Sequence, residues 1–442
     1  MNSITIREYG VLYYSETDGL NVPVPSNLDS REIAKTAWEW LLSTTGTDEH
    51  KFLVKPIRRY NKMVLQVVNY VGVITTPCGC QIEILPKIIS HKHGDDDDYL
   101  RRVRKKLFTM LDTVQRLKFK SFNHASLEIF NQPLPDILIR LFLGEVAFLI
   151  KKGIRNDYVS VRDETAFLKG RLQVAAQIRQ PVGRQHLFQV EYDEFLPDRA
   201  ENRLIHSSLK KVSKWSHSIE NKRLANELLF VFDDISESMN TKLDFSRWLD
   251  RDRSMVHYRG LKEWCKLILN EESPFSLSGH QHGMSFLFPM NYLFEEYVAI
   301  MLRSHQLKPE YDLIEQSTRH SLVKHDEKDL FQMKPDILIR DQADKDQVVM
   351  DCKWKRLDSN DKANKYGISQ GDMYQLYAYG QKYLNGSGDM FLIYPESDDF
   401  KEPLPVFDYS DDLKLWVVPF IFGDIDAIKL PENPGVDGIF KK

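Results

Sequence analysis

Two acidic residues and a lysine in the last third of the chain have the types and spacing needed for metal-dependent hydrolysis. Asp336 opens one short apolar run, and Asp351 and Lys353 lie two residues apart at the end of another. Because side chains alternate along a strand, Asp351 and Lys353 project in the same direction. Two carboxylates held close together repel each other, and a hard divalent cation such as Mg²⁺ relieves the repulsion. A lysine beside that cation can orient an attacking water and help to deprotonate it.

A β-hairpin is the element that would position these three residues. The predicted strands are Pro335–Arg340 and Gln347–Lys355, separated by a polar stretch. If the inner ends of the strands, Arg340 and Gln347, form a pair, the register places Asp336 opposite Asp351. The Cβ atoms of such a pair lie about 4.5–5.5 Å apart. On this spacing alone an exposed hairpin with scattered charges is the favoured interpretation, because short acid–lysine patterns are common in long chains.

Two predicted helices bring further polar side chains near the hairpin. They are Asn291–Arg303 upstream and Asp372–Leu384 downstream. Glu295 and Glu296 flank the apolar stripe of the first helix on opposite sides, so periodicity does not choose between them. Gln375 and Tyr379 share a face of the second helix because they are four residues apart. The ordered set of helix glutamate, PD, DxK and QxxxY is far more specific than any single part and favours a nuclease site.

Length and composition predict a multidomain globular protein. The chain has 442 residues, of which 42% are hydrophobic and 28% charged, and this length suits two or three domains. The net charge of −4 gives no overall nucleic-acid signature, so any DNA contact must come from local basic patches. Four cysteines and the lack of an apolar signal core or a membrane span predict a cytoplasmic protein with no membrane partner.

The chain lacks the phosphate-binding loop of a nucleotide hydrolase. No glycine is directly followed by lysine, so the GxxxxGK[ST] pattern is absent. The chain is therefore not expected to be a P-loop NTPase itself.

Three segments differ in their predicted structure. Residues 1–125 read as a β-rich N-terminal domain, 126–283 as a mostly helical domain, and 284–442 as a mixed β-sheet flanked by helices. The predicted fold class is therefore α+β with several domains. Within the middle segment, Lys169-Gly170-Arg171 lies between two β-type runs, where glycine allows a tight turn that leaves both cations exposed.

The ordered motif resembles that of the PD-(D/E)xK nuclease superfamily. Longer stretches resemble McrC, the endonuclease subunit of the McrBC systems, which restrict DNA that carries modified cytosine. The similar stretches are Met290–Val298, Met333–Ile339, Val349–Lys355 and Asp372–Gly380, with more diffuse likeness at Gly72–Ile88, Leu168–Leu172 and Asp198–Leu209. The resemblance covers most of the chain and is strongest in the last third.

The resemblance implies roles for the residues of the hairpin. In the superfamily the two acids bind Mg²⁺ together with the carbonyl of the residue between acid and lysine, and Mn²⁺ can substitute. Carried over to this chain, the metal ligands are Asp336, Asp351 and the backbone carbonyl of Cys352. Lys353 is then the residue that orients the attacking water and stabilises developing charge.

The resemblance also implies roles for the helix residues. Gln375 and Tyr379 would position the lysine or the DNA backbone. The phenylalanine–glutamate pattern of the family selects Glu295 rather than Glu296 as the upstream acid and a further candidate metal ligand, although some relatives lack an acid there.

The partners follow from the family as well. In McrBC systems a separate AAA+ GTPase, McrB, forms a hexameric ring, recognises the modified base and translocates double-stranded DNA. McrC docks on that ring, stimulates GTP hydrolysis and cuts. We expect residues 126–283 to carry the docking. Cleavage of both strands requires two active sites, so two copies of the chain must meet at least transiently.

Two other functions fit parts of the sequence. A free-standing nuclease in repair or defence would need no GTPase partner. A non-catalytic adaptor that activates an AAA+ ring would need no acids and lysine of this kind, so the intact Asp336, Asp351 and Lys353 argue against it.

Overall fold

The structure is a computed structural model that describes most of the chain. The described residues are 3–14, 27–43, 54–59, 62–87, 97–115, 130–248, 255–269, 286–423, 425–431, 435–436 and 438–441. Within these ranges no helix is both long and apolar enough to span a membrane.

The chain divides into two compact units. Unit 1 combines Met1–Arg116, here called the N-terminal module, with Leu287–Lys442, here called the C-terminal module. Unit 2 is the intervening Leu117–Phe286. The division into domains 1–125, 126–283 and 284–442 stays a prediction, and its breaks lie near those of the two units. The first and third of these segments nevertheless pack into one unit.

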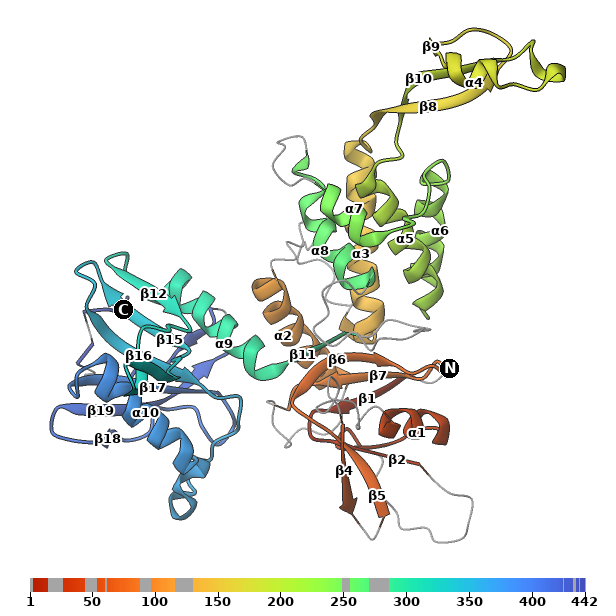
Figure 1. The fold of residues 1–442 in the computed structure, drawn as a ribbon. Helices are drawn as coiled ribbons and strands as arrows, with labels where there is room; N and C mark the ends of the chain where they lie inside the picture. Colours follow the sequence, from red (N-terminus) through yellow and green to blue (C-terminus); the bar gives the residue numbers. More distant parts are fainter. Residues whose placement is uncertain are drawn as a thin grey trace, which may run out of the picture. The chain divides into compact units, whose positions relative to one another are not determined.

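The C-terminal module is built on a seven-stranded mixed sheet (Figure 1). Its order is β12 (Tyr311–Glu315), β15 (Ile337–Asp341), β16 (Asp346–Cys352), β17 (Gly388–Pro395), β19 (Leu413–Ile421) and β18 (Phe407–Asp408), with β20 (Ala427–Ile428) also paired to β19. Strands β16, β17 and β19 run parallel, whereas β12, β15 and β16 pair antiparallel. A separate hairpin consists of β13 (Ser321–His325) and β14 (Lys328–Gln332).

Two helices cover opposite faces of this sheet. Helix α9 (Met290–Met301) places Phe294 against Trp354, which continues the Met350 and Cys352 face of β16. Helix α10 (Gln370–Tyr383) packs Leu376 into a buried cluster with Val349, on the alternate face. α10 approaches the sheet closely at Gly380, where a Cβ atom would lie 2.8 Å from side-chain atoms of Leu413 and Met390. The predicted mixed sheet with flanking helices is confirmed.

The N-terminal module is rich in β-strands, as predicted. One sheet has the order β1 (Ser3–Arg7), β7 (Gln81–Leu85), β6 (Tyr70–Thr75) and β11 (Phe286–Pro289), of which β11 comes from the chain just before α9 and not from the N-terminal module itself. A second has the order β3 (Ser30–Glu32), β2 (Val11–Tyr13), β5 (Lys62–Val67) and β4 (Val54–Arg59). Helices α1 (Lys35–Ser43) and α2 (Asp97–Gln115) complete the module, and α2 contacts both β7 and α9.

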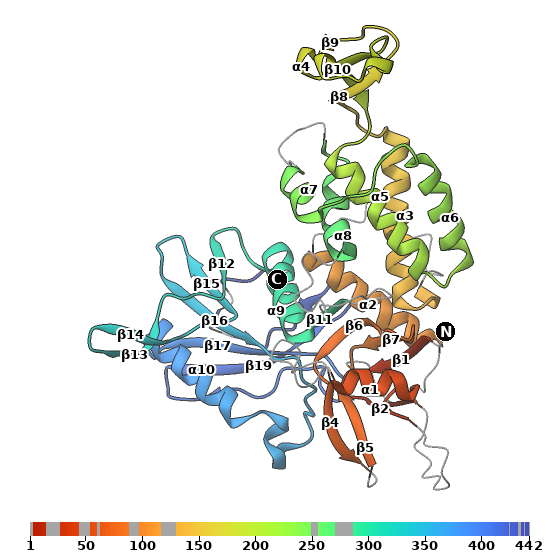
Figure 2. The same ribbon diagram turned by 45° about the vertical axis from the view of Figure 1, so that its right-hand side comes forward.

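Unit 2 is mostly helical, as predicted for the middle of the chain. Its helices are α3 (Leu134–Lys152), α5 (Ala200–Trp215), α6 (Ile219–Val231), α7 (Thr241–Arg247) and α8 (Arg259–Leu269). At one end of these helices lies a small β-lobe (Figures 1 and 2), made of β8 (Asp157–Thr165), β10 (Phe188–Leu196), β9 (Arg171–Leu172) and α4 (Val174–Ile178). Gly170 has φ = +67°, and Lys169 and Arg171 are exposed, so the predicted glycine turn is confirmed.

A buried ion pair fastens α2 to the first sheet of the N-terminal module. Arg104 donates to both carboxylate oxygens of Glu83, at 2.8 and 2.7 Å, and Thr5 donates to the same carboxylate at 2.7 Å. Glu83 is fully buried and Arg104 is 5% exposed. The charge of Glu83 is therefore tolerated because the guanidinium compensates for it.

Removing that guanidinium should destabilise the protein strongly. Arg104→Ala buries the Glu83 charge without its bidentate partner, and we expect a loss of about 3–5 kcal/mol in the free energy of unfolding. Thermal and denaturant unfolding of the full chain measure it. The control is Arg101→Ala on the same helix, whose ion pair with Asp98 is largely exposed and should matter by about 1 kcal/mol or less. Equal effects of the two substitutions would contradict this account.

Candidate active site

The hairpin formed by β15 and β16 has most of the predicted register. The observed pairs are Ile337 with Met350, Leu338 with Val349, and Ile339 with Val348. The predicted pair of Arg340 with Gln347 is wrong, because a bulge follows Ile339 and Arg340 pairs with Asp346 instead. An ion pair of 2.7 Å between the Arg340 guanidinium and the Asp346 carboxylate accompanies this shift. The bulge lies at the loop end of the hairpin, so the predicted register holds toward the acids.

The two predicted acids meet at the opposite end of the hairpin. Asp351 is the penultimate residue of β16 and is fully buried, whereas Asp336 immediately precedes β15 and is partly buried. Asp336 Oδ2 accepts a hydrogen bond of 2.7 Å from the backbone N–H of Cys352. This bond holds the Asp336 carboxylate against the strand residue that follows Asp351.

Lys353 joins the acids, and α10 holds it there. Its Nζ atom lies 2.5 Å from Asp351 Oδ2 and donates to Gln375 Oε1 at 3.5 Å. Gln375 Nε2 donates to the Tyr379 hydroxyl at 2.8 Å, and that hydroxyl donates to the carbonyl of Lys334 at 2.9 Å. A chain of hydrogen bonds thus runs from the lysine through α10 to the backbone two residues before Asp336. The structure brings these predicted residues together.

Glu295 faces the same group of charges from α9. Burial, and then the charge of Asp351, raises the pKa of Glu295 to about 7, while Lys353 opposes the rise. The pKa of Glu296 is also raised by burial, but the neighbouring charge that adds to the rise is Glu315 on β12. Glu295 is therefore the glutamate that approaches the acids, as the resemblance implied.

The acids of this cluster bind protons unusually tightly. Burial raises the pKa of Asp336 to about 8, with further contributions from the charges of Asp351 and Glu295. Burial also raises the pKa of Asp351, although Lys353 acts against it. The pKa of Lys353 is lowered by burial but raised by a larger total from Asp351 and its neighbours, so the ammonium stays charged. At neutral pH the carboxyl groups therefore share protons unless a cation replaces them.

The donor set fits a hard divalent cation. Asp351 Oδ1 is buried and has no hydrogen-bond donor, which is rare for a polar atom inside a protein. In the part of the chain that the structure describes, no cluster of three or more His, Cys, Asp or Glu side chains is arranged to hold a metal ion. A cation held by Asp336 and Asp351 would therefore need a backbone oxygen as well, and the Cys352 carbonyl is the predicted one. The thiol of Cys352 is buried in the sheet on the other face.

Glu8 and Trp354 belong to the surroundings of the site, and sequence reasoning missed Glu8. Glu8 Oε1 accepts a hydrogen bond of 2.8 Å from the indole N–H of Trp354, the residue after Lys353. The only available signal was the aromatic residue that follows the lysine. Glu8 lies 346 positions from Trp354 in the sequence, so no local sequence pattern could predict this hydrogen bond.

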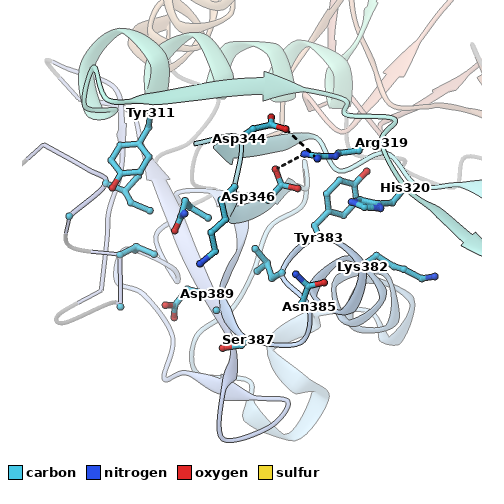
Figure 3. Close-up of a pocket in the computed structure, with 18 residues that line it drawn as sticks. Tyr311, Arg319, His320, Asp344, Asp346, Lys382, Tyr383, Asn385, Ser387 and Asp389 are labelled. Atoms are coloured by element: carbon cyan, nitrogen blue, oxygen red, sulfur yellow. Dashed lines mark ion pairs between the residues drawn. The ribbon is translucent and has the colours of Figure 1, made fainter. Parts of the chain in front are cut away.

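A separate hollow lies at the other end of β16 and carries a different set of residues. It has a volume of about 740 Å³ and is lined by the start of β16 and the end of α10. Figure 3 shows Arg319 between Asp344 and Asp346, with ion pairs of 3.3 and 3.9 Å. Its charged groups are thus partly paired with each other. The predicted site residues do not line it.

Fold and site together define an α+β protein of several modules with paired carboxylates at the end of a hairpin in a mixed sheet. Residues 65–395 match the family model for the McrBC 5-methylcytosine restriction system component. The match spans most of the chain, so the chain belongs to this McrBC family, as the resemblance implied.

A solved structure shares the fold. A chain in the refined half-complex from the tetradecameric assembly of Thermococcus gammatolerans McrB AAA+ hexamers with bound McrC matches with a TM-score of 0.66 and 20% identity, over 95% of each chain. A chain of the Thermococcus gammatolerans McrBC complex, solved by cryo-EM, has a TM-score of 0.49 and 22% identity over 69% of this chain and 88% of that one. No curated protein sequence gives a significant match.

The raised carboxyl pKa values predict that the metal-free site destabilises the fold at high pH. The folded protein holds a proton on Asp336 up to about pH 8, whereas an unfolded chain loses it near pH 4, so stability should fall as pH rises between these values. Asp336→Asn removes this contribution and keeps an acceptor for the Cys352 N–H. At pH 8 in EDTA we expect the variant to be about 1–2 kcal/mol more stable than the wild type.

Melting temperatures measured in EDTA from pH 4 to pH 8 check this expectation. The gain should shrink toward pH 4, where both side chains are neutral. Asp411→Asn, at an exposed position, is the control and should change little. A variant less stable than the wild type at pH 8 would contradict the assignment.

Proposed function

We propose that the chain is the Mg²⁺-dependent DNA endonuclease subunit, of the McrC type, in a McrBC-like GTP-dependent restriction complex that cleaves DNA carrying modified cytosine. The observation that carries the proposal is the meeting of Asp336, Asp351 and Lys353 at one end of the hairpin. Membership of the McrBC family supports the restriction role. The PD-(D/E)xK arrangement of the C-terminal module is part of the same proposal.

The acids are the proposed metal ligands. Asp336, Asp351 and the carbonyl of Cys352 would hold Mg²⁺, and Mn²⁺ is expected to substitute. Glu295 is the further candidate ligand that the resemblance implies. When bound, the cation neutralises charge on the phosphate and lowers the pKa of a bound water. The carboxyl groups must first release the protons that they hold at neutral pH.

Lys353 is the proposed residue for orienting the attacking water. Its ammonium is held by Asp351 and Gln375 and stays protonated, so it can donate to a water or to a phosphate oxygen. Gln375 restrains the ammonium, and Tyr379 restrains Gln375 through a hydrogen bond of 2.8 Å. Because Tyr379 also binds the Lys334 carbonyl, the helix fixes the lysine relative to the strand that follows Asp336.

The proposed partner is a hexameric AAA+ GTPase of the McrB type. The solved assembly that shares the fold contains McrB AAA+ hexamers with bound McrC, and we extend that arrangement to this chain. The β-lobe of unit 2 offers a docking surface because it exposes many large apolar side chains. They include Tyr158, Phe167, Leu168, Val174, Ile178, Val182 and Phe195. Two copies of the complex would meet on double-stranded DNA to cut both strands.

Substitutions at the site should separate cleavage from GTPase stimulation. Asp351→Asn and Lys353→Ala each remove a group from the reacting centre, and we expect cleavage to fall by about 10²–10⁴-fold or more. The assay uses the chain with its GTPase partner, GTP, Mg²⁺ and DNA carrying modified cytosine. Stimulated GTP hydrolysis should stay at the wild-type level, because these residues are remote in sequence from the β-lobe.

Lys382→Ala is the matched control, since Lys382 is an exposed lysine at the far end of α10. Wild-type cleavage by Asp351→Asn or Lys353→Ala, in preparations free of other nucleases, would remove the site assignment.

A charge in the β-lobe should block docking. Val182 is 85% exposed, and Val182→Asp places a carboxylate on the proposed apolar contact. We expect weaker binding to the GTPase ring, by about tenfold or more, and a matching loss of stimulation, because an unpaired charge is costly to bury in an interface. The control is Ile219→Asp at the start of α6, an equally exposed apolar residue outside the lobe. Equal loss in both variants, or no loss in either, would contradict docking through the lobe.

A further inference from the structure

A hollow of about 600 Å³ opens beside Lys353 and has walls from both modules of unit 1. The N-terminal module contributes Glu8, Asn69 and Lys87. The C-terminal module contributes Lys353 and the residues that follow it, among them Lys355 and Arg356. The proposed water-orienting lysine therefore borders a space that the C-terminal module does not enclose alone.

The carboxylate of Glu8 joins the two walls. Glu8 is 2% exposed, and its Oε1 atom accepts both the indole N–H of Trp354 and the backbone N–H of Lys87, each at 2.8 Å. Trp354 follows Lys353 directly, and Trp354 also packs its ring on Phe294 of α9. One buried group thus fixes the backbone of Lys87 relative to the strand end that carries Lys353.

More positively charged than negatively charged side chains line the hollow. Four of the lining residues are cationic, namely Lys87, Lys353, Lys355 and Arg356, whereas Glu8 and Asp372 are acidic. Even with Lys353 paired to Asp351, three cations remain. Burial raises the pKa of Glu8 to about 7, so much of it is neutral near physiological pH. Among the described residues the Lys87 ammonium makes no ion pair, and the Arg356 guanidinium lies 3.8 Å from Asp399. The hollow therefore favours a negatively charged ligand.

Two further features of the hollow suit an anion with oxygen acceptors. The N-terminus of α10 borders it through Ser369 and Asp372, and the positive end of a helix dipole attracts phosphate groups. Glu8 lines the hollow, and its Oε2 atom is buried and has no hydrogen-bond partner among the described residues. A protonated Glu8 can donate from this atom to a phosphate oxygen.

We propose that this hollow binds the phosphodiester backbone of DNA next to the scissile phosphate, with Lys87 of the N-terminal module facing the cations that follow Lys353. The proposal rests on the nuclease function proposed above and adds to it a substrate site shared by two modules. The N-terminal module then has a direct part in holding substrate. Contacts to phosphates carry no sequence information, so the site should hold DNA of any sequence.

The test is the salt dependence of DNA binding to the full chain. The probe is a fluorescein-labelled duplex of about 25 base pairs, and the measurement is fluorescence anisotropy from 50 to 200 mM salt. All proteins carry Asp351→Asn and the buffer contains EDTA, so that no cleavage occurs. Each phosphate contact contributes about −0.9 to the slope of log K, the association constant for DNA, against log salt concentration. Between 50 and 200 mM salt, a variant that has lost one contact should therefore lose about threefold less affinity than the parent does.

Lys87→Ala should therefore weaken binding and lower the salt slope by about one, equally for two duplexes of unrelated sequence. Lys87→Arg keeps the charge and should retain most of the affinity. Lys324→Ala, at an exposed position on β13, is the control and should bind as the parent does. Unchanged affinity and slope in Lys87→Ala would overturn the proposal, and so would the absence of any DNA binding by the parent chain.

These outcomes are distinct from failure of the nuclease proposal. If Lys87→Ala leaves binding unchanged while Asp351→Asn abolishes cleavage, the shared site is wrong and the nuclease assignment stands. If Lys87→Ala weakens binding while Asp351→Asn still cleaves, the metal-site assignment is wrong and the shared DNA site stands.

Discussion

Two carboxylates held together inside the C-terminal module set the constraint on which the rest of the site depends. Asp351 is fully buried, and Asp336 is tied beside it by the Cys352 N–H. Neither charge is stable alone in such a place, because burial and mutual repulsion both favour the protonated acids. The protein compensates only in part, with one ammonium at 2.5 Å and one backbone N–H. The remaining imbalance is the reason for proposing a cation at this site, and in the absence of a cation it lowers the stability of the fold.

Packing on both faces of β16 stabilises the strand that carries Asp351. On one face α10 meets the sheet closely at Gly380 and holds Lys353 through Gln375 and Tyr379. On the other face α9 packs against Trp354 and presents Glu295. Lys353 is thus held by α10, and Tyr379 of the same helix donates a hydrogen bond to the Lys334 carbonyl. Confinement of this kind fixes the position of the ammonium relative to the two acids.

Local patterns in the sequence were sufficient for the parts of the site that lie on single elements. Strand alternation placed Asp351 and Lys353 on one face, and helical spacing placed Gln375 over Tyr379; both arrangements are present. The bulge at Arg340 was not predicted, because alternation of apolar and polar residues carries no information about it. In the structure it is accompanied by the ion pair between Arg340 and Asp346. The bond between Glu8 and Trp354, and the packing of the first and last segments into one unit, join residues hundreds of positions apart. Such contacts leave no periodic trace in a single sequence.

Because of this long-range packing, the N-terminal module contacts elements that position the candidate site. From the sequence, residues 1–125 and 284–442 were predicted to be separate domains. In the structure the buried Glu8 carboxylate bonds to the residue after Lys353, and α2 of the N-terminal module packs on α9, which carries Glu295. The position of the lysine is therefore set by three layers, α10, the sheet and the N-terminal module. A displacement of the N-terminal module would therefore act both on the strand end at Trp354, one residue from the proposed reacting centre, and on α9.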